Sequence, residues 1–246
     1  MTPLTSRRID LNADVGEGTG TEELLAPLCS SWNLCCGAHA GSPDDLNRAL
    51  ELAKTYGISC GAHPGHSDRE HFGRVAIPID RSGLRKLIVP QIETVARAAQ
   101  KHGLELTHLK LHGALYHQAG SDPQLAEETI LVAGEFGLLI FGFPGSVLAN
   151  LATPAGPFVP EGFADRGMDS QGNLLPRGTP GAILYDPGVA AQQGLRLALS
   201  DCVKTLCVHG DSPDAARMLG AVRTRLLEEG FQIAAPTSEF PRVIAP

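Results

Sequence analysis

Strand-like and helix-like segments alternate along nearly all of the 246-residue chain, and this alternation restricts the fold more than any other feature. Two weak strand candidates occur at residues 182–184 and 231–233, and seven stronger ones at 8–12, 31–36, 58–61, 107–111, 138–141, 158–159 and 205–208. Strands separated by helices indicate a parallel sheet covered by helices. We therefore predict an α/β fold with a single domain over residues 1–246. Periodicity does not decide between a closed barrel and an open sheet.

Several helix starts have the same local chemistry, a capping side chain followed by proline at the first helical position. The pairs are Ser42-Pro43, Asp122-Pro123, Asp186-Pro187 and Ser212-Pro213. The helix that begins after Ser42 should end at Gly57. Another helix is expected from Asp80 to Gly103, and Pro90 inside it should kink or split it.

Composition excludes several classes of protein. The net charge is −7 and the basic residues are scattered, which argues against a nucleic-acid binder. No apolar run reaches the roughly 18–20 residues needed to cross a bilayer, and the polar first eight residues lack the apolar centre of a signal peptide. The six cysteines form no C-x-x-C pair, and most lie in apolar stretches, so we interpret them as reduced core residues. We therefore expect a cytoplasmic protein with no nucleic-acid or membrane partner.

Polar residues gather where predicted strands end. In parallel α/β folds the loops that follow the strands share one rim, and ligands bind there. We expect one site on this rim, formed by residues at or just after the strand ends. They are Asn12, Asp14 and Glu17 at the first strand, His39, His63, Lys110 and His112 at the next three, and Glu161, Asp165, Arg166, His209 and Asp211 at the sixth and seventh.

Each of these residues also has a structural interpretation. Asp14 and Glu17 could cap the following helix, and a lone histidine after a strand is more often a structural hydrogen-bonding group. The remaining histidines are interpreted as surface or structural residues: His66, His71, His102, His108 and His117.

Two kinds of chemistry suit such a rim. Histidines and carboxylates could hold a divalent ion that activates water, with Asp14, His39 and His112 as candidate ligands from separate strands. Alternatively, crowded carboxylates, histidines and a lysine could perform metal-free acid–base catalysis. The chain has no G-x-S-x-G elbow, P-loop or G-x-G-x-x-G motif, which argues against a serine hydrolase and against nucleotide binding by these motifs in this chain alone.

The motifs resemble those of the LamB/YcsF family in order and over nearly the whole chain, at residues 9–17, 33–41, 61–65, 72–74, 110–116, 163–166, 176–177 and 208–211. The resemblance implies a distorted TIM-like barrel of about seven parallel strands with outer helices. It also implies ATP-dependent opening of 5-oxo-L-proline to L-glutamate with two partner 5-oxoprolinase subunits, of the B and C type. In this family the partners are expected to use the ATP and phosphorylate the lactam oxygen, after which this chain hydrolyses the activated ring.

With this resemblance we assign roles to the rim residues as hypotheses. Asp14, His39 and His112 would orient or activate water, Lys110 and Arg166 would hold the substrate carboxylate or phosphoryl group, and His209 and Asp211 would move a proton to the leaving nitrogen. Asn12, Glu17, His63 and Asp165 would complete the substrate site. The competing hypotheses are a stand-alone metal-dependent deacetylase or amidohydrolase, a non-catalytic scaffold subunit, and a lactam-binding protein without hydrolytic activity.

Overall fold

Seven parallel strands form a closed barrel in the computed structural model, which describes residues 7–153, 156–200, 202–211 and 214–237. Each strand pairs with the next in sequence, and β7 pairs with β1 to close the ring. The strands are β1 (Arg8–Val15), β2 (Ser31–Cys35), β3 (Ser59–His63), β4 (Leu106–Leu109), β5 (Leu139–Gly142), β6 (Phe158–Phe163) and β7 (Thr205–Cys207). A short parallel strand, β8 (Gln232–Ile233), pairs with the start of β1. The predicted single-domain TIM-like barrel is confirmed.

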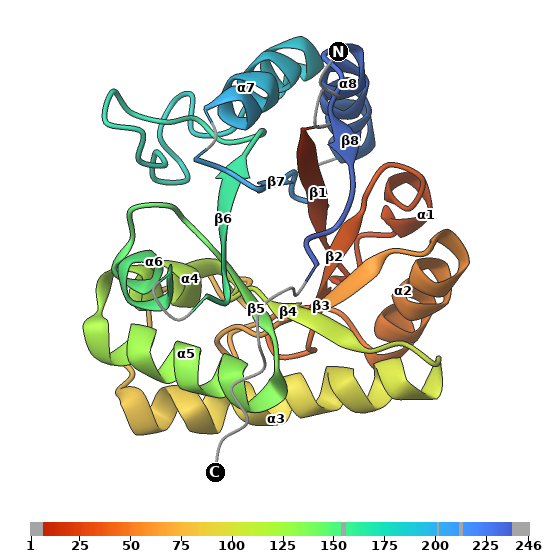
Figure 1. Cartoon of the computed structure of the whole chain (residues 1–246). Helices are drawn as coiled ribbons and strands as arrows, with labels where there is room; N and C mark the ends of the chain where they lie inside the picture. The colour runs from red at the N-terminus through yellow and green to blue at the C-terminus, as the bar shows by residue number, and fades with distance from the viewer. Residues whose placement is uncertain (1–6, 154–155, 201, 212–213, 238–246) are drawn as a thin grey trace.

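Helices surround the strands, as Figure 1 shows. They are α1 (Glu22–Leu25), α2 (Pro43–Tyr56), α3 (Arg81–Lys101), α4 (Gly113–Ser121), α5 (Pro123–Phe136), α6 (Val147–Ala152), α7 (Pro187–Leu199) and α8 (Ala215–Glu228). None of the helices within the described ranges is long and apolar enough to span a membrane.

The predicted helix caps are present where the structure describes them. Ser42 accepts a hydrogen bond from the Asp45 N–H, and Gly57 ends α2 in the left-handed conformation. Pro90 lies inside the single continuous helix α3, so the helix is not split there. The predicted start at Ser212-Pro213 lies outside the described residues, and α8 begins at Ala215.

Strand β1 shows how the barrel separates polar from apolar side chains. Ile9, Leu11 and Ala13 belong to the apolar core under the helices, whereas Asn12 and Asp14 contact polar groups inside the barrel. The predicted strand ended at residue 12, but β1 continues to Val15. The prediction stopped short because a polar inward face resembles a loop, although the period of two continues. Asn12 and Asp14 therefore lie in the barrel wall.

Two other sequence predictions were wrong in detail. Residues 182–184 do not form a strand: only an isolated antiparallel bridge joins Ile183 to Arg166. All six cysteines are free, but Cys202 is exposed and is therefore not a core residue.

Candidate functional site

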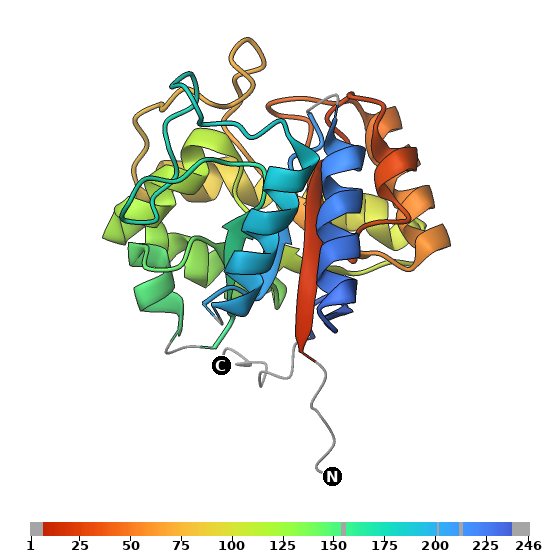
Figure 2. The same cartoon turned by 90° about the horizontal axis from the view of Figure 1, so that it is seen from above.

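A cavity of about 410 Å³, including its open mouth, lies at the carboxyl ends of the strands. The loops 64–80 and 166–186 extend beyond this end of the barrel (Figure 2). Six residues predicted from the sequence line the cavity: Asp14, His63, Lys110, His112, Arg166 and His209. They come from five different strand ends, so the barrel does bring distant parts of the chain to one place.

Lys110 forms the centre of a buried ion-pair network below the cavity. Its Nζ lies 2.9 Å from Asp14 Oδ1 and 2.9 Å from Glu161 Oε1. Asn12 donates to the same Glu161 oxygen at 3.1 Å. Burial alone would lower the pKa of Lys110, but the two carboxylates and the nearby Cys207 raise it well above its usual value. Lys110 is therefore a charged group whose charge is already balanced by its neighbours.

The Asp14 carboxylate remains ionised despite its burial. Burial acts to raise its pKa, but His63 and Lys110 together hold it well below the usual value. Asp14 Oδ2 lies 3.4 Å from His63 Nε2 and 4.0 Å from His209 Nε2. Asp14 thus presents a negative charge to the cavity between two histidines.

His63 and His112 form a pair that must hold one extra proton. His63 Nδ1 lies 2.8 Å from the Lys110 carbonyl oxygen, and His112 Nε2 lies 2.8 Å from the Phe72 carbonyl oxygen. A carbonyl can only accept, so both outer nitrogens carry hydrogen. The inner bond, 2.9 Å from His63 Nε2 to His112 Nδ1, needs a third hydrogen. Two neutral imidazoles supply only two, so the pair carries one positive charge.

Asp14 lies on the His63 side of this pair, with its carboxylate 3.4 Å from His63 Nε2. Burial and the neighbouring His63 and His39 hold the pKa of His112 well below its ordinary value, so His112 is neutral. Both ring nitrogens of His112 are occupied by these hydrogen bonds, which leaves it no free lone pair to activate water in this arrangement.

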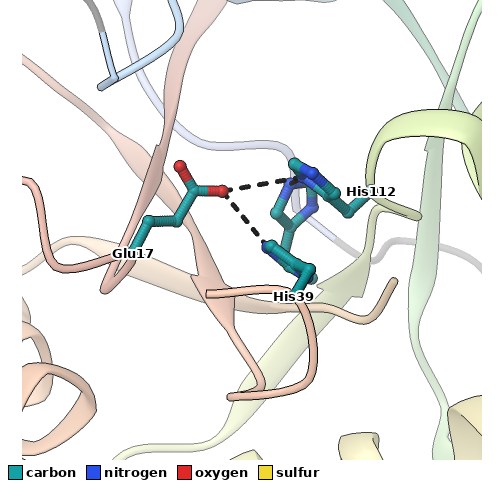
Figure 3. Close-up of side chains that lie close together, drawn as sticks. Glu17, His39 and His112 are labelled. Atoms are coloured by element: carbon teal, nitrogen blue, oxygen red, sulfur yellow. Dashed lines mark hydrogen bonds and ion pairs between the residues drawn. The ribbon is translucent and has the colours of Figure 1, made fainter. Parts of the chain in front are cut away.

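Glu17 and His39 lie close to His112 (Figure 3), but they are not among the residues that line the cavity. The rings of His39 and His112 stack at 3.7 Å between centroids, and Glu17 Oε1 lies 3.3 Å from His39 Nε2 and 3.6 Å from His112 Nδ1. Burial and the nearby Asp14 raise the pKa of Glu17 to about 7. Burial and the nearby His63 lower the pKa of His39 to about 3, so His39 is neutral.

The segment Phe72-Gly73-Arg74 covers this histidine cluster. Phe72 has a φ of 56°, an unfavourable value for a residue with a side chain, and its carbonyl accepts the hydrogen bond from His112. A Cβ on Gly73 would lie 3.0 Å from both His39 and His112 and would also sit at a φ of 63°. The Arg74 guanidinium stacks over the Phe72 ring at 4.8 Å. The close packing explains why this turn contains a glycine.

His209 is held at the cavity by Asp165. The Asp165 Oδ2 accepts from the His209 backbone N–H at 2.9 Å and from the ring Nδ1 at 2.8 Å. Burial acts to raise the pKa of Asp165, but His209 keeps it below the usual value. The Nδ1–H is therefore fixed toward a carboxylate, and Nε2 is left facing Asp14. Asp211, which the sequence led us to place with His209, instead forms an ion pair with Arg74.

The chain offers two groups of metal-binding donors among the described residues. Glu17, His39, His63 and His112 form one group, and Asp14, Cys207 and His209 form the other. The predicted set of Asp14, His39 and His112 draws on both groups. The stacked rings of His39 and His112 are 3° from parallel, so their in-plane lone pairs cannot both point at one ion. The arrangement as it stands fits a hydrogen-bonded cluster better than a metal centre, and the metal set stays a prediction.

The sequence placed Glu161 on the rim but gave it no role in the site, and the structure pairs it with Lys110. Glu161 lies within β6, beyond the predicted end of that strand at residue 159. His117, interpreted as a surface or structural residue, lines the cavity. Arg74, Tyr116 and Arg177 line it too, although the sequence points to them only as parts of family motifs. His108 is a buried structural residue, as one of the two interpretations proposed: its Nε2 lies 2.9 Å from Asn33 Oδ1.

Fold and site together define a class of protein, a parallel (β/α) barrel with a cavity lined by histidines, charged residues and an aspartate at the carboxyl ends of its strands. The model of the LamB/YcsF family matches residues 9–241. This chain belongs to the LamB/YcsF family.

Named relatives agree with this assignment. The chain is 38% identical to the A-type subunit of 5-oxoprolinase from Methylococcus capsulatus, covering 94% of this chain and 96% of that protein. It is 36% identical to the A-type subunit of 5-oxoprolinase from Symbiobacterium thermophilum, covering 95% and 97%.

Solved structures give the same result. A lactam utilization protein from Thermus thermophilus has a TM-score of 0.85 and 35% identity, covering 93% of this chain and 99% of that one. The catalytic domain of a peptidoglycan N-acetylglucosamine deacetylase from Eubacterium rectale has a TM-score of 0.60 at 14% identity, covering 98% of this chain and 93% of that one, and so shows similarity of fold alone.

Proposed function

We propose that this chain is the hydrolytic subunit of a 5-oxoprolinase, which opens the ring of 5-oxo-L-proline to give L-glutamate. The names of the relatives support the substrate. The observation that carries the proposal is the position of His209: Asp165 fixes its Nδ1–H, and its free Nε2 faces the cavity opposite Asp14. An imidazole oriented in this way can take a proton from water and later return it.

Ring opening adds one water molecule across the lactam C–N bond. The water oxygen bonds to the ring carbonyl carbon while His209 Nε2 takes one of its protons. The C–N bond then breaks, and the nitrogen leaves as an amine after receiving a proton from His209. Asp14 would orient the water, and the Asp14 and Asp165 carboxylates would stabilise the imidazolium that His209 becomes.

A lactam carbonyl is a weak electrophile, so activation by ATP is part of the proposal. Partner subunits of the B and C type would transfer the phosphoryl group from ATP to the lactam oxygen. Addition of water to the activated ring carbon and cleavage of the C–N bond would then leave an acyl phosphate, and a second water would hydrolyse it to L-glutamate and inorganic phosphate. The cavity lining supports an anionic substrate because it includes Arg166 and Arg177, which have no ion-pair contact among the described residues.

Reconstitution tests the proposal. The purified chain is mixed with candidate partner subunits, ATP and 5-oxoproline, and glutamate is measured while each component is omitted in turn. Glutamate should form only in the complete mixture, and His209→Ala should abolish it. A non-catalytic scaffold predicts instead that His209→Ala retains full turnover.

The second candidate function is a stand-alone metal-dependent amidohydrolase. Four donor atoms in one buried group, those of Glu17, His39, His63 and His112, favour it. It predicts that the chain alone hydrolyses a small amide when a divalent ion is added, and that a chelator stops the reaction. Stoichiometric metal in the purified protein, together with activity without partners, would replace the first proposal with this one.

A further inference from the structure

Three arginines line the cavity and come from the two loops that extend beyond this end of the barrel (Figure 2). Arg74 belongs to loop 64–80, and Arg166 and Arg177 belong to the segment between β6 and α7. Their charges are not equally compensated. Lys110, deeper in the cavity, is already paired with Asp14 and Glu161, and Arg74 is paired with Asp211.

Arg166 is buried, and its guanidinium is fixed by uncharged partners. Its Nε donates to the Ala182 carbonyl at 3.0 Å, and its Nη2 donates to the Leu175 carbonyl at 2.7 Å. These bonds orient the guanidinium without neutralising it. Burial lowers the pKa of Arg166, and the positive charges of Arg177 and Arg74 lower it further, so the three groups act on one another.

Arg177 is the least constrained of the three. Within the described part of the chain it makes no hydrogen bond and no ion-pair contact, although it is only partly exposed and lines the cavity. Long cationic side chains normally extend into water or toward a carboxylate. The charge of Arg177 lowers the pKa of Arg166, and an anion bound near both groups would relieve this repulsion.

The lining groups indicate the type of anion. Within the described residues, Arg166 and Arg177 have no carboxylate at ion-pair distance, although the nearby Asp165, which is hydrogen-bonded to His209, offsets part of their charge. Two guanidinium groups suit the several oxygens of a phosphoryl group better than the two oxygens of a single carboxylate. Guanidinium groups also donate two parallel hydrogen bonds, a geometry that suits phosphate oxygens.

We propose that Arg177, together with Arg166 and the nearby Arg74, forms a phosphoryl-binding subsite at the mouth of the cavity. The proposal rests on the proposed function, because only an activated substrate would bring a phosphoryl group here, with inorganic phosphate as the product released. The subsite would hold the phosphoryl group at the open end, while the ring carbon lies deeper, toward Asp14 and His209.

Inorganic phosphate is a direct probe because the chain needs no partner to bind it. Calorimetry should detect saturable phosphate binding to the purified chain, and Arg177→Ala should weaken it about tenfold or more. Arg177→Lys keeps the charge but loses the two-pronged geometry, so we expect an intermediate loss. The matched control is Arg97→Ala, an exposed arginine on α3 that pairs with Glu93 and should leave phosphate affinity unchanged.

The outcomes separate the subsite from the activity. Absence of saturable phosphate binding, or equal losses in Arg177→Ala and Arg97→Ala, overturns the subsite. A loss of 5-oxoproline binding with unchanged phosphate binding overturns it as well, because Arg177 would then hold the substrate carboxylate. If phosphate binding depends on Arg177 while the reconstituted complex makes no glutamate, the subsite stands and the proposed function fails.

Discussion

Asp165 accepts two hydrogen bonds from His209 through a single oxygen, one from the backbone N–H at 2.9 Å and one from the ring Nδ1 at 2.8 Å. The histidine backbone and side chain are thus fixed to the same carboxylate. Asp211, two residues after His209, belongs instead to an ion pair with Arg74. The orientation of His209 therefore depends on an acid that is 44 positions away in sequence.

This difference between two aspartates gives the first prediction. Asp165→Asn would no longer fix the Nδ1–H tautomer of His209, so turnover by the reconstituted complex should fall about 100-fold or more with a small change in KM. Asp211→Asn is the matched control and should cost much less, because it disturbs only the pair with Arg74. Steady-state glutamate formation measures both. Equal losses in the two variants would show that Asp165 has no special relationship to His209.

The second prediction concerns His112. His112→Ala removes the acceptor for the His63 N–H and leaves a buried space, so the free energy of unfolding should fall by about 2–4 kcal/mol and turnover should be lost. His112→Asn keeps an acceptor near the position of Nδ1 and should restore part of the stability. Urea unfolding and glutamate formation provide the measurements, with exposed His71→Ala as the control. A folded His112→Ala variant with near-normal turnover contradicts the assignment of His112 to the site.

The third prediction is a pH dependence of stability that comes from Glu17. Its pKa is about 7 in the folded protein and 4.5 for an unperturbed glutamate, mainly because burial opposes its charge. A raised carboxyl pKa means that the folded state binds the proton more tightly than the unfolded state. The stabilisation by protonated Glu17 is therefore complete below pH 4.5 and is lost as pH rises through about 7.

Glu17→Gln removes this titration. Relative to the unmodified chain, the variant should gain stability between pH 4.5 and 7, by an amount on the order of 3 kcal/mol at most, at about 1.4 kcal/mol per pH unit. Urea unfolding at several pH values measures the difference. Glu51→Gln, on the exposed face of α2, is the surface control. A Glu17→Gln difference that is constant with pH would show that Glu17 is ionised in the folded protein throughout this range.

Sequence periodicity was sufficient for the α/β class and for the shared rim of the strand ends, whereas the closed barrel was expected only from the resemblance to the LamB/YcsF family. Individual pairings inside the site were not predictable in the same way. Lys110 pairs with Glu161 from β6, a contact that depends on barrel closure and the inward face of each strand. His209 pairs with Asp165 and not with nearby Asp211 for the same reason. Sequence distance carries no information about which side chains face each other across a barrel.

Short elements and loop contacts were also beyond the sequence. Helix α6 has only 6 residues. Helix α4 begins after His112 without a side-chain cap, because the His112 ring is hydrogen-bonded to the Phe72 carbonyl instead. The contact of Phe72 with His112 depends on a loop backbone at positive φ, which only the folded loop defines. The position of the free Arg177 guanidinium is likewise a loop property.

Gly61 gives the fourth prediction, on the packing inside the barrel. A Cβ at this position would lie 2.1 Å from Cδ2 of His108, on the neighbouring strand β4. His108 cannot move aside easily, because its ring stacks on Phe141 at 4.0 Å and hydrogen-bonds to Asn33. Gly61→Ala should therefore reduce the free energy of unfolding by about 1–3 kcal/mol through overpacking.

Gly134 in α5 is the matched control, because it is exposed and an added Cβ there would meet no heavy atom within 4 Å. Gly134→Ala should raise stability by about 0.5–1 kcal/mol, since alanine favours the helix. Denaturant midpoints of the two variants should thus move in opposite directions, and a Gly61→Ala variant as stable as the unmodified chain would show that His108 does not fill the space across from Gly61.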